Sequence, residues 1–116
     1  MRKLATIRKI TNIVPIENCD NIALAIVDGW TVIIKKSEFS IGDLCVFFEI
    51  DSFLPLEPRY EFLKKTTKFD GKEGYRIKTM KMKGVLSQGL ALPLSMFPEV
   101  STNDDDDTNR LNVIKL

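Results

Sequence analysis

The sequence predicts an all-β fold, a barrel or a sandwich, in a single domain. Short apolar runs rich in Val, Ile and Thr recur from residue 4 to residue 94, and Asp-Gly or Gly-Asp pairs separate several of them. Strands and turns at this spacing are typical of small β barrels and sandwiches. A chain of 116 residues can bury one core, but it lacks the material for a second one.

The first expected strand covers residues 4–16. Apolar residues recur along it at every third position, which suits a helix as well as a strand: Leu4, Ile7, Ile10 and Ile13. The density of β-branched residues favours a pleated backbone, and Pro15 would interrupt a helix. We therefore predict one long strand with a bulge that changes which face points inward.

Residues 22–35 predict a hairpin. The pair Asp28-Gly29 lies between two apolar runs, and such a pair is a strong signal for a tight turn. Because side chains alternate along a strand, we expect the even positions of the second run to enter the core. These positions are Trp30, Val32 and Ile34.

The remaining elements follow from shorter patterns. Residues 44–50 are nearly continuous in apolar side chains, which indicates a central strand covered on both faces. Pro58 suits the first position of a helix, so we expect one short helix near residues 58–65. Closing strands are expected at 75–79 and 85–92. The core choices in these strands are Val46, Phe48, Ile77 and Leu90.

We assign residues 1–100 to the folded domain and residues 101–116 to an acidic linker or tail. The run Asp104 to Asp107 lies in a stretch without large apolar side chains, so this stretch is expected to be mobile. Residues 111–116 are apolar enough to add an edge strand.

The composition excludes several classes of enzyme and of site. The chain has no histidine, which removes Ser-His-Asp and Cys-His catalysis and zinc sites that need imidazole. Two cysteines, Cys19 and Cys45, are too few for a zinc cage or a disulfide scaffold and are expected to be reduced thiols of a cytoplasmic protein. The longest apolar stretch, 44–48, is far shorter than a bilayer span, so we expect no membrane partner.

Basic residues gather in one part of the chain, although the net charge is only +1. Nine Lys or Arg lie between residues 59 and 83, against three acidic residues, a local balance of +6. If a loop or bulge near residues 79–80 interrupts the strand, four of these cations can face one partner: Arg76, Lys78, Lys81 and Lys83. A phosphate-binding patch and an ordinary solvated face both remain open at this point.

Aromatic residues in the same part of the chain are candidates for base stacking. Trp30 is expected in the core, so the candidates are the aromatics interleaved with the lysines: Tyr60, Phe62, Phe69 and Tyr75.

Two further motifs have a chemical and a structural interpretation. Lys68-Phe69-Asp70-Gly71 matches the KxDG signature of covalent nucleotidyltransferases, yet Asp-Gly is also a favoured turn pair, and the pocket that the chemistry needs is not recognisable. Glu49 and Asp51 have the spacing to share a hard cation, but nothing supplies the remaining ligands. We favour a charged turn and a strand end, and assign no catalytic residue and no metal ligand in this chain.

Several stretches together resemble the N-terminal module of an ATP-dependent RNA ligase family, in which an OB-fold domain precedes the nucleotidyltransferase domain. The resemblance covers about residues 1–100 in order, and the tail matches poorly. The stretches are RKLATI at 2–7, PIENCDNI at 15–22, DGW at 28–30, FFEIDSFLP at 47–55, YRIKTMKMKG at 75–84 and LSQG at 86–89.

The resemblance implies a five-stranded, mostly antiparallel OB-fold barrel with one short helix. It also implies an accessory module that binds RNA and positions RNA ends for sealing, with a nucleotidyltransferase domain as its partner in cis or in trans. ATP and magnesium would belong to that downstream domain, and Lys68 does not correspond to the family's adenylated lysine. The alternatives are a free-standing OB-fold module that binds single-stranded or structured RNA, and a protein-interaction domain.

Overall fold

The computed structural model describes residues 4–82, 84–100, 111 and 113–115. These residues form strands and two short 3-10 helices. The elements, in chain order, are β1 (Ala5–Pro15), β2 (Ile22–Val27), β3 (Trp30–Lys35), β4 (Leu44–Glu49), β5 (Ser52–Pro55), η1 (Pro58–Leu63), β6 (Thr67–Phe69), β7 (Lys72–Arg76), β8 (Met80–Met82), β9 (Val85–Ser87), β10 (Gly89–Pro93), η2 (Leu94–Met96) and β11 (Ile114–Lys115).

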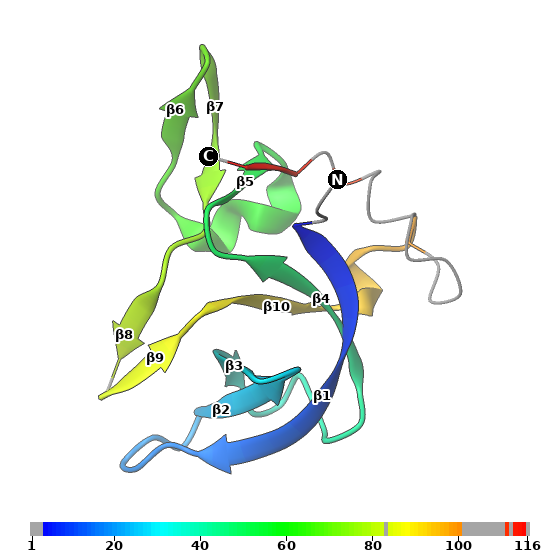
Figure 1. Ribbon diagram of the computed structural model, residues 1–116, viewed down its shortest axis with the longest axis vertical. Coiled ribbons are helices and arrows are strands. Elements are labelled where there is room, and N and C mark those ends of the chain that lie inside the picture. Colours follow the sequence, from blue (N-terminus) through cyan, green and yellow to red (C-terminus); the bar gives the residue numbers. More distant parts are fainter. Residues whose placement is uncertain (1–3, 83, 101–110, 112, 116) are drawn as a thin grey trace.

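Five antiparallel strands form the body of the molecule, in the order β10-β4-β1-β2-β3. The sheet curls until its two outer strands approach each other and a nearly closed barrel results (Figure 1). At one end of this seam the amide of Gln88 donates to the carbonyl of Thr31 at 2.7 Å, and the Gln88 side chain accepts from the Thr31 amide at 3.1 Å. The predicted all-β barrel of five strands is confirmed.

The long first strand contains the predicted bulge. The pairing of β1 with β2 shifts register between Ile10 and Asn12, while residues 5–9 pair with β4 instead. A bulge adds one residue on one strand and increases its twist. One strand therefore serves two neighbours and curves around the barrel.

The hairpin of β2 and β3 is also as predicted. Asp28 and Gly29 have φ values of 48° and 84°, and this pair of left-handed residues matches the right-handed twist of the flanking strands. In β3 the side chains of Val32 and Ile34 are buried, whereas Trp30 is only partly buried and packs on the ring of Phe47 at 5.9 Å.

Most of the predicted core is confirmed, and β4 is its centre. Val46 and Phe48 are fully buried, and Ile77 is nearly so. Leu90 is partly buried and packs against this core. The Phe48 ring meets the Tyr60 ring edge to face at 6.1 Å, a favourable arrangement of two quadrupoles. The core therefore joins the barrel to η1.

The connection between β4 and β10 is the least regular part of the chain. The expected helix is η1, a 3-10 helix with Pro58 at its start. The strand expected at 75–79 lies earlier, as β7, and the strand expected at 85–92 is divided into β9 and β10. The division follows from Gln88, whose amide and side chain both bond to Thr31.

A bidentate ion pair fastens this connection to the end of the barrel. The Arg59 guanidinium donates to both carboxylate oxygens of Glu99, at 2.9 and 2.8 Å, and to the carbonyl of Met96 at 3.1 Å. It also lies 4.6 Å from the centre of the Phe97 ring, within the range of a cation–π contact. These bonds hold η1 beside η2.

The C-terminal residues touch the same body. Leu111 is fully buried in the core cluster around Phe48, and β11 pairs with β5 at the edge of a four-stranded sheet of order β11-β5-β7-β6. The predicted edge strand is confirmed. The predicted mobile stretch at 101–108 lies outside the described residues.

Candidate nucleic-acid interface

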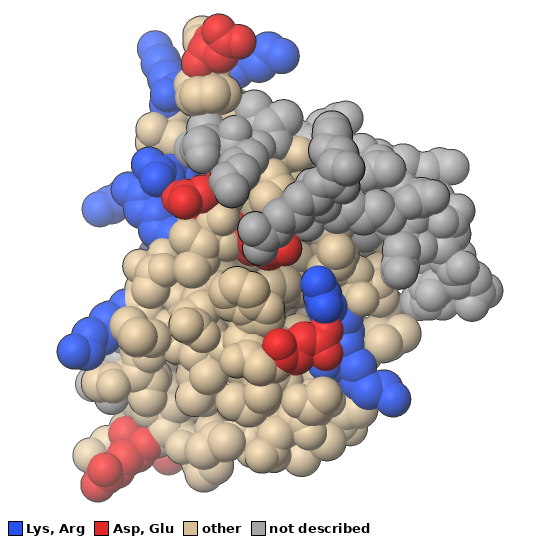
Figure 2. Space-filling model, viewed as in Figure 1, with Lys and Arg blue, Asp and Glu red and all other residues tan. Residues whose placement is uncertain are grey.

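Lys and Arg side chains gather along one side of the molecule. Figure 2 shows them from the tip of the β6–β7 hairpin downward along the left edge of the view. The elements on that edge are β6, β7 and β8, which all belong to the connection between β4 and β10 (Figure 1). Apart from Arg59, which pairs with Glu99, the described cations of the basic segment therefore lie in one region in space.

The backbone is interrupted within the predicted patch. β7 ends at Arg76, β8 begins at Met80, and Arg76, Lys78 and Lys81 are exposed. Ile77, between the first two, is buried and exchanges backbone hydrogen bonds with Asp51 and Ser52 at 2.7 and 2.9 Å. This anchor turns the side chains of its two neighbours away from the core. Lys83 lies outside the described residues.

The three described cations of the patch differ in their surroundings. Arg76 donates to the Asp51 carboxylate at 2.8 Å, so a phosphate must compete with a carboxylate for this guanidinium. Lys78 and Lys81 form no ion pair with any residue that the structure describes, so their ammonium groups face water. Asp51 is distant from Arg76 in the sequence, and no local pattern could have linked them.

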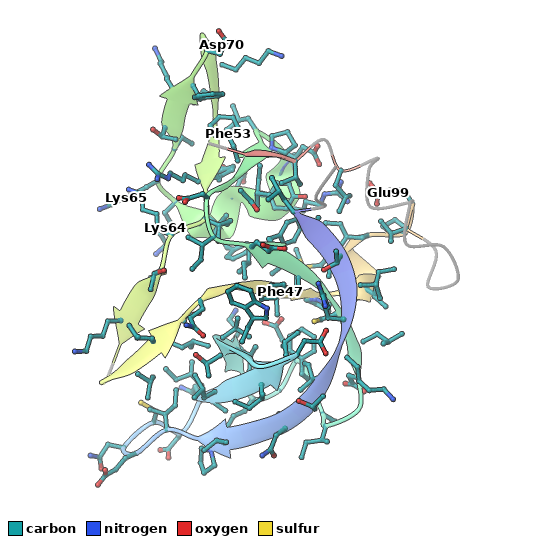
Figure 3. All side chains as sticks on the ribbon, in the orientation of Figure 1. Phe47, Phe53, Lys64, Lys65, Asp70 and Glu99 are labelled. Atoms are coloured by element: carbon teal, nitrogen blue, oxygen red, sulfur yellow. The ribbon has the colours of Figure 1, made fainter. Side chains whose placement is uncertain are left out.

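Two further lysines point away from the body beside the patch. Lys64 and Lys65 follow η1 directly and project in the same direction as each other (Figure 3). Lys64 has a φ of 66° and a ψ of −42°, a conformation that costs a non-glycine residue roughly 1–3 kcal/mol. They belong to the basic segment, but no strand pattern in the sequence marks them as part of the patch.

The structure divides the four stacking candidates into two pairs. Tyr60 is fully buried and Tyr75 is 4% exposed, so the prediction that they offer rings to a nucleobase was wrong. Both pack in the core cluster around Phe48. Phe62 and Phe69 are 50% and 42% exposed, and only these two rings are accessible.

The KxDG sequence forms a turn. Asp70 and Gly71, with φ values of 53° and 77°, connect β6 and β7, and Lys68 lies opposite Glu73 on the hairpin. The carboxylate of Asp51 is engaged by Arg76, and no group of three or more metal-binding side chains lies together among the described residues. The preference for a charged turn is confirmed.

Burial also sets the protonation of two groups in the core. Desolvation raises the pKa of the Cys45 thiol to about 12 and the pKa of the Tyr60 hydroxyl to about 12. A thiol that stays protonated at neutral pH is a poor nucleophile. Cys45 is thus a packing residue.

The fold and the site define a class of protein. A family model of an OB-fold domain matches residues 4–94, and the chain belongs to this family.

The described part of the chain contains no helix with the length and apolar character needed to cross a bilayer.

Among solved structures, this chain is similar to part of an RNA ligase. A mutant of the Naegleria gruberi RNA ligase with ATP and Mn superimposes with a TM-score of 0.92 at 46% sequence identity, covering 97% of this chain and 35% of that chain. The same ligase with PPi gives a TM-score of 0.92 at 46% identity, covering 99% of this chain and 35% of that chain. No curated protein matches the sequence.

The resemblance stated from the sequence is therefore confirmed: this chain is similar to the OB module of an RNA ligase. It spans 35% of the length of the ligase that it matches.

Proposed function

We propose that this chain is the accessory RNA-binding module of an ATP-dependent RNA ligase. In this proposal the module holds an RNA end or a nick in place, while a nucleotidyltransferase domain, in cis or in trans, performs the sealing. ATP and the divalent metal act in that second domain. The observation that carries the proposal is the identity of 46% over 97% of this chain with the Naegleria gruberi RNA ligase.

The charge distribution supports an RNA-binding role. OB-fold domains bind oligonucleotides with the face of their second and third strands and with adjoining loops, including the connection between the fourth and fifth barrel strands. In this chain that connection contains β5 to β9 and carries most of the exposed cations among the described residues. Lysine and arginine neutralise phosphates without reading bases, so we expect binding that tolerates different sequences.

A chimera tests the sealing role. We would replace the matched segment of the Naegleria gruberi ligase with this chain and measure sealing of a nicked RNA, beside the same ligase with the segment deleted. The chimera should seal faster than the deletion variant. Equal rates, with binding of RNA by this chain intact, would instead favour the free-standing RNA-binding module.

A matched pair of variants tests the phosphate patch. Lys78→Ala with Lys81→Ala removes two exposed cations from the patch, and Lys9→Ala with Lys36→Ala removes two exposed cations elsewhere. Each phosphate contact on a single strand contributes about 0.7 to the log–log salt slope. The patch pair should lower the slope by about 1.4 across unrelated RNA sequences, and the other pair by clearly less. Equal slopes for the two variants would show that the patch has no special role.

A further inference from the structure

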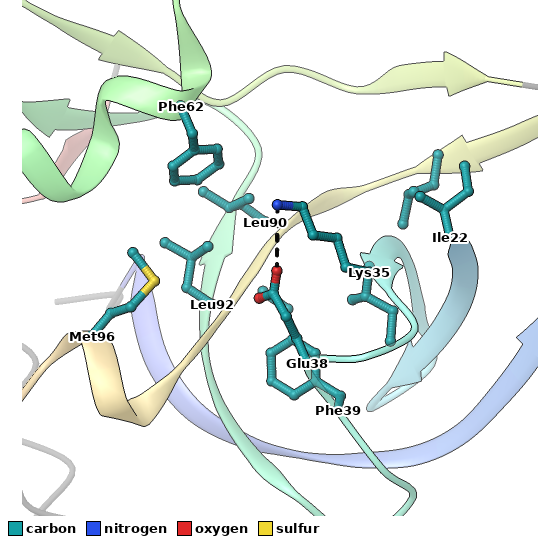
Figure 4. Close-up of a pocket in the computed structure, with 11 residues that line it drawn as sticks. Ile22, Lys35, Glu38, Phe39, Phe62, Leu90, Leu92 and Met96 are labelled. Carbon is teal, nitrogen blue, oxygen red and sulfur yellow. Dashed lines mark ion pairs between the residues drawn. The ribbon is translucent and has the colours of Figure 1, made fainter. Parts of the chain in front are cut away.

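A cavity of about 370 Å³ lies where the barrel is not fully closed. β3 and β10 are the outer strands of the five-stranded sheet, and no backbone ladder pairs them among the described residues. The contact of Thr31 with Gln88 and the hydrogen bond from the Ile33 amide to the Ser87 hydroxyl, at 3.0 Å, close one end of the seam. Side chains from both strands and from η1 and η2 surround the opening (Figure 4). Those used below are Ile33, Lys35, Glu38, Phe62, Leu90 and Leu92.

Phe62 is the aromatic wall of this cavity. Its ring lies at the mouth beside Leu90 and Leu92 (Figure 4), and half of the residue is exposed. A flat aromatic face at an apolar cavity is suited to stack on a planar ligand, and every nucleobase has such a face.

One donor and one acceptor stand at the same mouth. The Lys35 ammonium lies 3.9 Å from a carboxylate oxygen of Glu38, and both side chains line the cavity. The edge of a nucleobase presents donors and acceptors side by side. A loose and exposed ion pair can exchange its partners for that edge at little cost.

Two groups of cations lie near the cavity, one after Phe62 in η1 and one beside β3. Lys64 and Lys65 follow Phe62, and Lys64 is held in a strained conformation. On the side of β3, Lys81 is paired with Leu86, whose carbonyl accepts from the Thr31 hydroxyl at 2.9 Å. A single strand of nucleic acid has bases with apolar faces and an anionic backbone. The apolar cavity suits the face of a base, and the basic segments beside it suit the phosphates.

We propose that this cavity binds one unpaired base of a single-stranded RNA, stacked on the ring of Phe62. The flanking phosphates then lie on Lys64 and Lys65 on one side and on Lys81 on the other. A volume of about 370 Å³ falls in the range of small-molecule sites, about 300–1,000 Å³. The inference rests on the proposed function, because it names the part of the RNA that the module holds.

The test compares two ligands that differ only in their bases. The full chain is titrated, by fluorescence anisotropy, with single-stranded RNA of about ten nucleotides, a typical site size, and with an abasic strand of equal length. The protein should bind the normal strand roughly tenfold more tightly, as expected for one stacked base. Phe62→Ala should abolish this preference and leave the salt slope unchanged. Ile41→Ala, which removes an exposed apolar side chain outside the cavity, should retain the preference.

The outcomes separate this inference from the proposed function. Equal affinity of the unmodified chain for both strands, or a full preference in Phe62→Ala, overturns the base site while phosphate binding stands. Absence of binding to either strand at low salt overturns both. If Phe62→Ala keeps the preference but weakens association with a nucleotidyltransferase domain, the cavity is a protein-docking site and the base proposal is wrong.

Discussion

The strand β4 and the connection that follows it differ in how far their side chains are buried. In β4 every residue after Leu44 is buried, and the strand lies between β1 and β10. In the connection from β5 to β9 the charged side chains are mostly exposed, and a few residues, such as Tyr60 and Ile77, anchor it to the core. Burial therefore determines the barrel, while a small number of anchoring residues position a basic surface.

The largest expected effect is on the barrel side of this comparison. Phe48→Ala removes a fully buried ring that contacts the rings of Tyr60 and Phe97. Its free energy of unfolding should fall by about 3–5 kcal/mol, measured by urea denaturation. Phe69→Ala removes a ring that is 42% exposed and should cost less than about 1 kcal/mol. Similar losses for both variants would mean that burial does not separate the two regions.

The next effect is a loss of stability at alkaline pH. The folded protein holds the pKa of Cys45 at about 12, against an ordinary 9.0, so the unfolded chain loses this proton first as the pH rises. Stability from this thiol is fully present below pH 9 and declines between pH 9 and 12. At about pH 10.5 the decline amounts to about 2 kcal/mol.

The cysteine can be separated from the other titrating groups by substitution. Cys45→Ala should lose about 2 kcal/mol less than the unmodified protein between about pH 8 and pH 10.5, in urea denaturation at both values. An identical pH profile for the two proteins would place the thiol in contact with water.

The sequence predicts the features that depend on neighbouring residues, and it does not predict those that depend on contacts between residues far apart in the chain. Asp28-Gly29 determines its hairpin from adjacent residues, and the bulge in β1 follows from a run of β-branched residues with a fixed spacing. Gln88 could not be recognised as the residue that divides β9 from β10, because its partner Thr31 lies 57 positions away. The lysines that surround Tyr60 and Tyr75 in the sequence predict accessible rings, yet the two rings pack against each other at 6.4 Å and lie within the core.

A smaller change in stability is expected at Tyr60, one of the residues that anchor the connection to the core. The Tyr60 hydroxyl is buried and has no partner with hydrogen-bond geometry among the described residues, although the Arg59 guanidinium lies near it. An unsatisfied buried polar group costs about 1–3 kcal/mol. Tyr60→Phe keeps the ring contacts and removes that group, so the protein should be more stable by about 1 kcal/mol. Thermal unfolding measures the change, and Tyr75→Phe serves as the comparison. A clear loss of stability in Tyr60→Phe would indicate that the hydroxyl has a partner.

The smallest expected effect is a change in RNA affinity when an ion pair on the basic surface is broken. Asp51 pairs with Arg76 at 2.8 Å, and both side chains are about 40% exposed, so the pair contributes less than about 1 kcal/mol to stability. Asp51→Asn tolerates the same left-handed backbone, with its φ of 68°, since asparagine adopts this region readily. The substitution frees the guanidinium, and RNA should bind a few-fold more tightly with a salt slope larger by about 0.7. Asp28→Asn makes the same change of charge at another left-handed residue, where the partner is Arg8 at 2.6 Å. If both variants gain affinity equally, net charge explains the gain, and Arg76 has no special position in the interface.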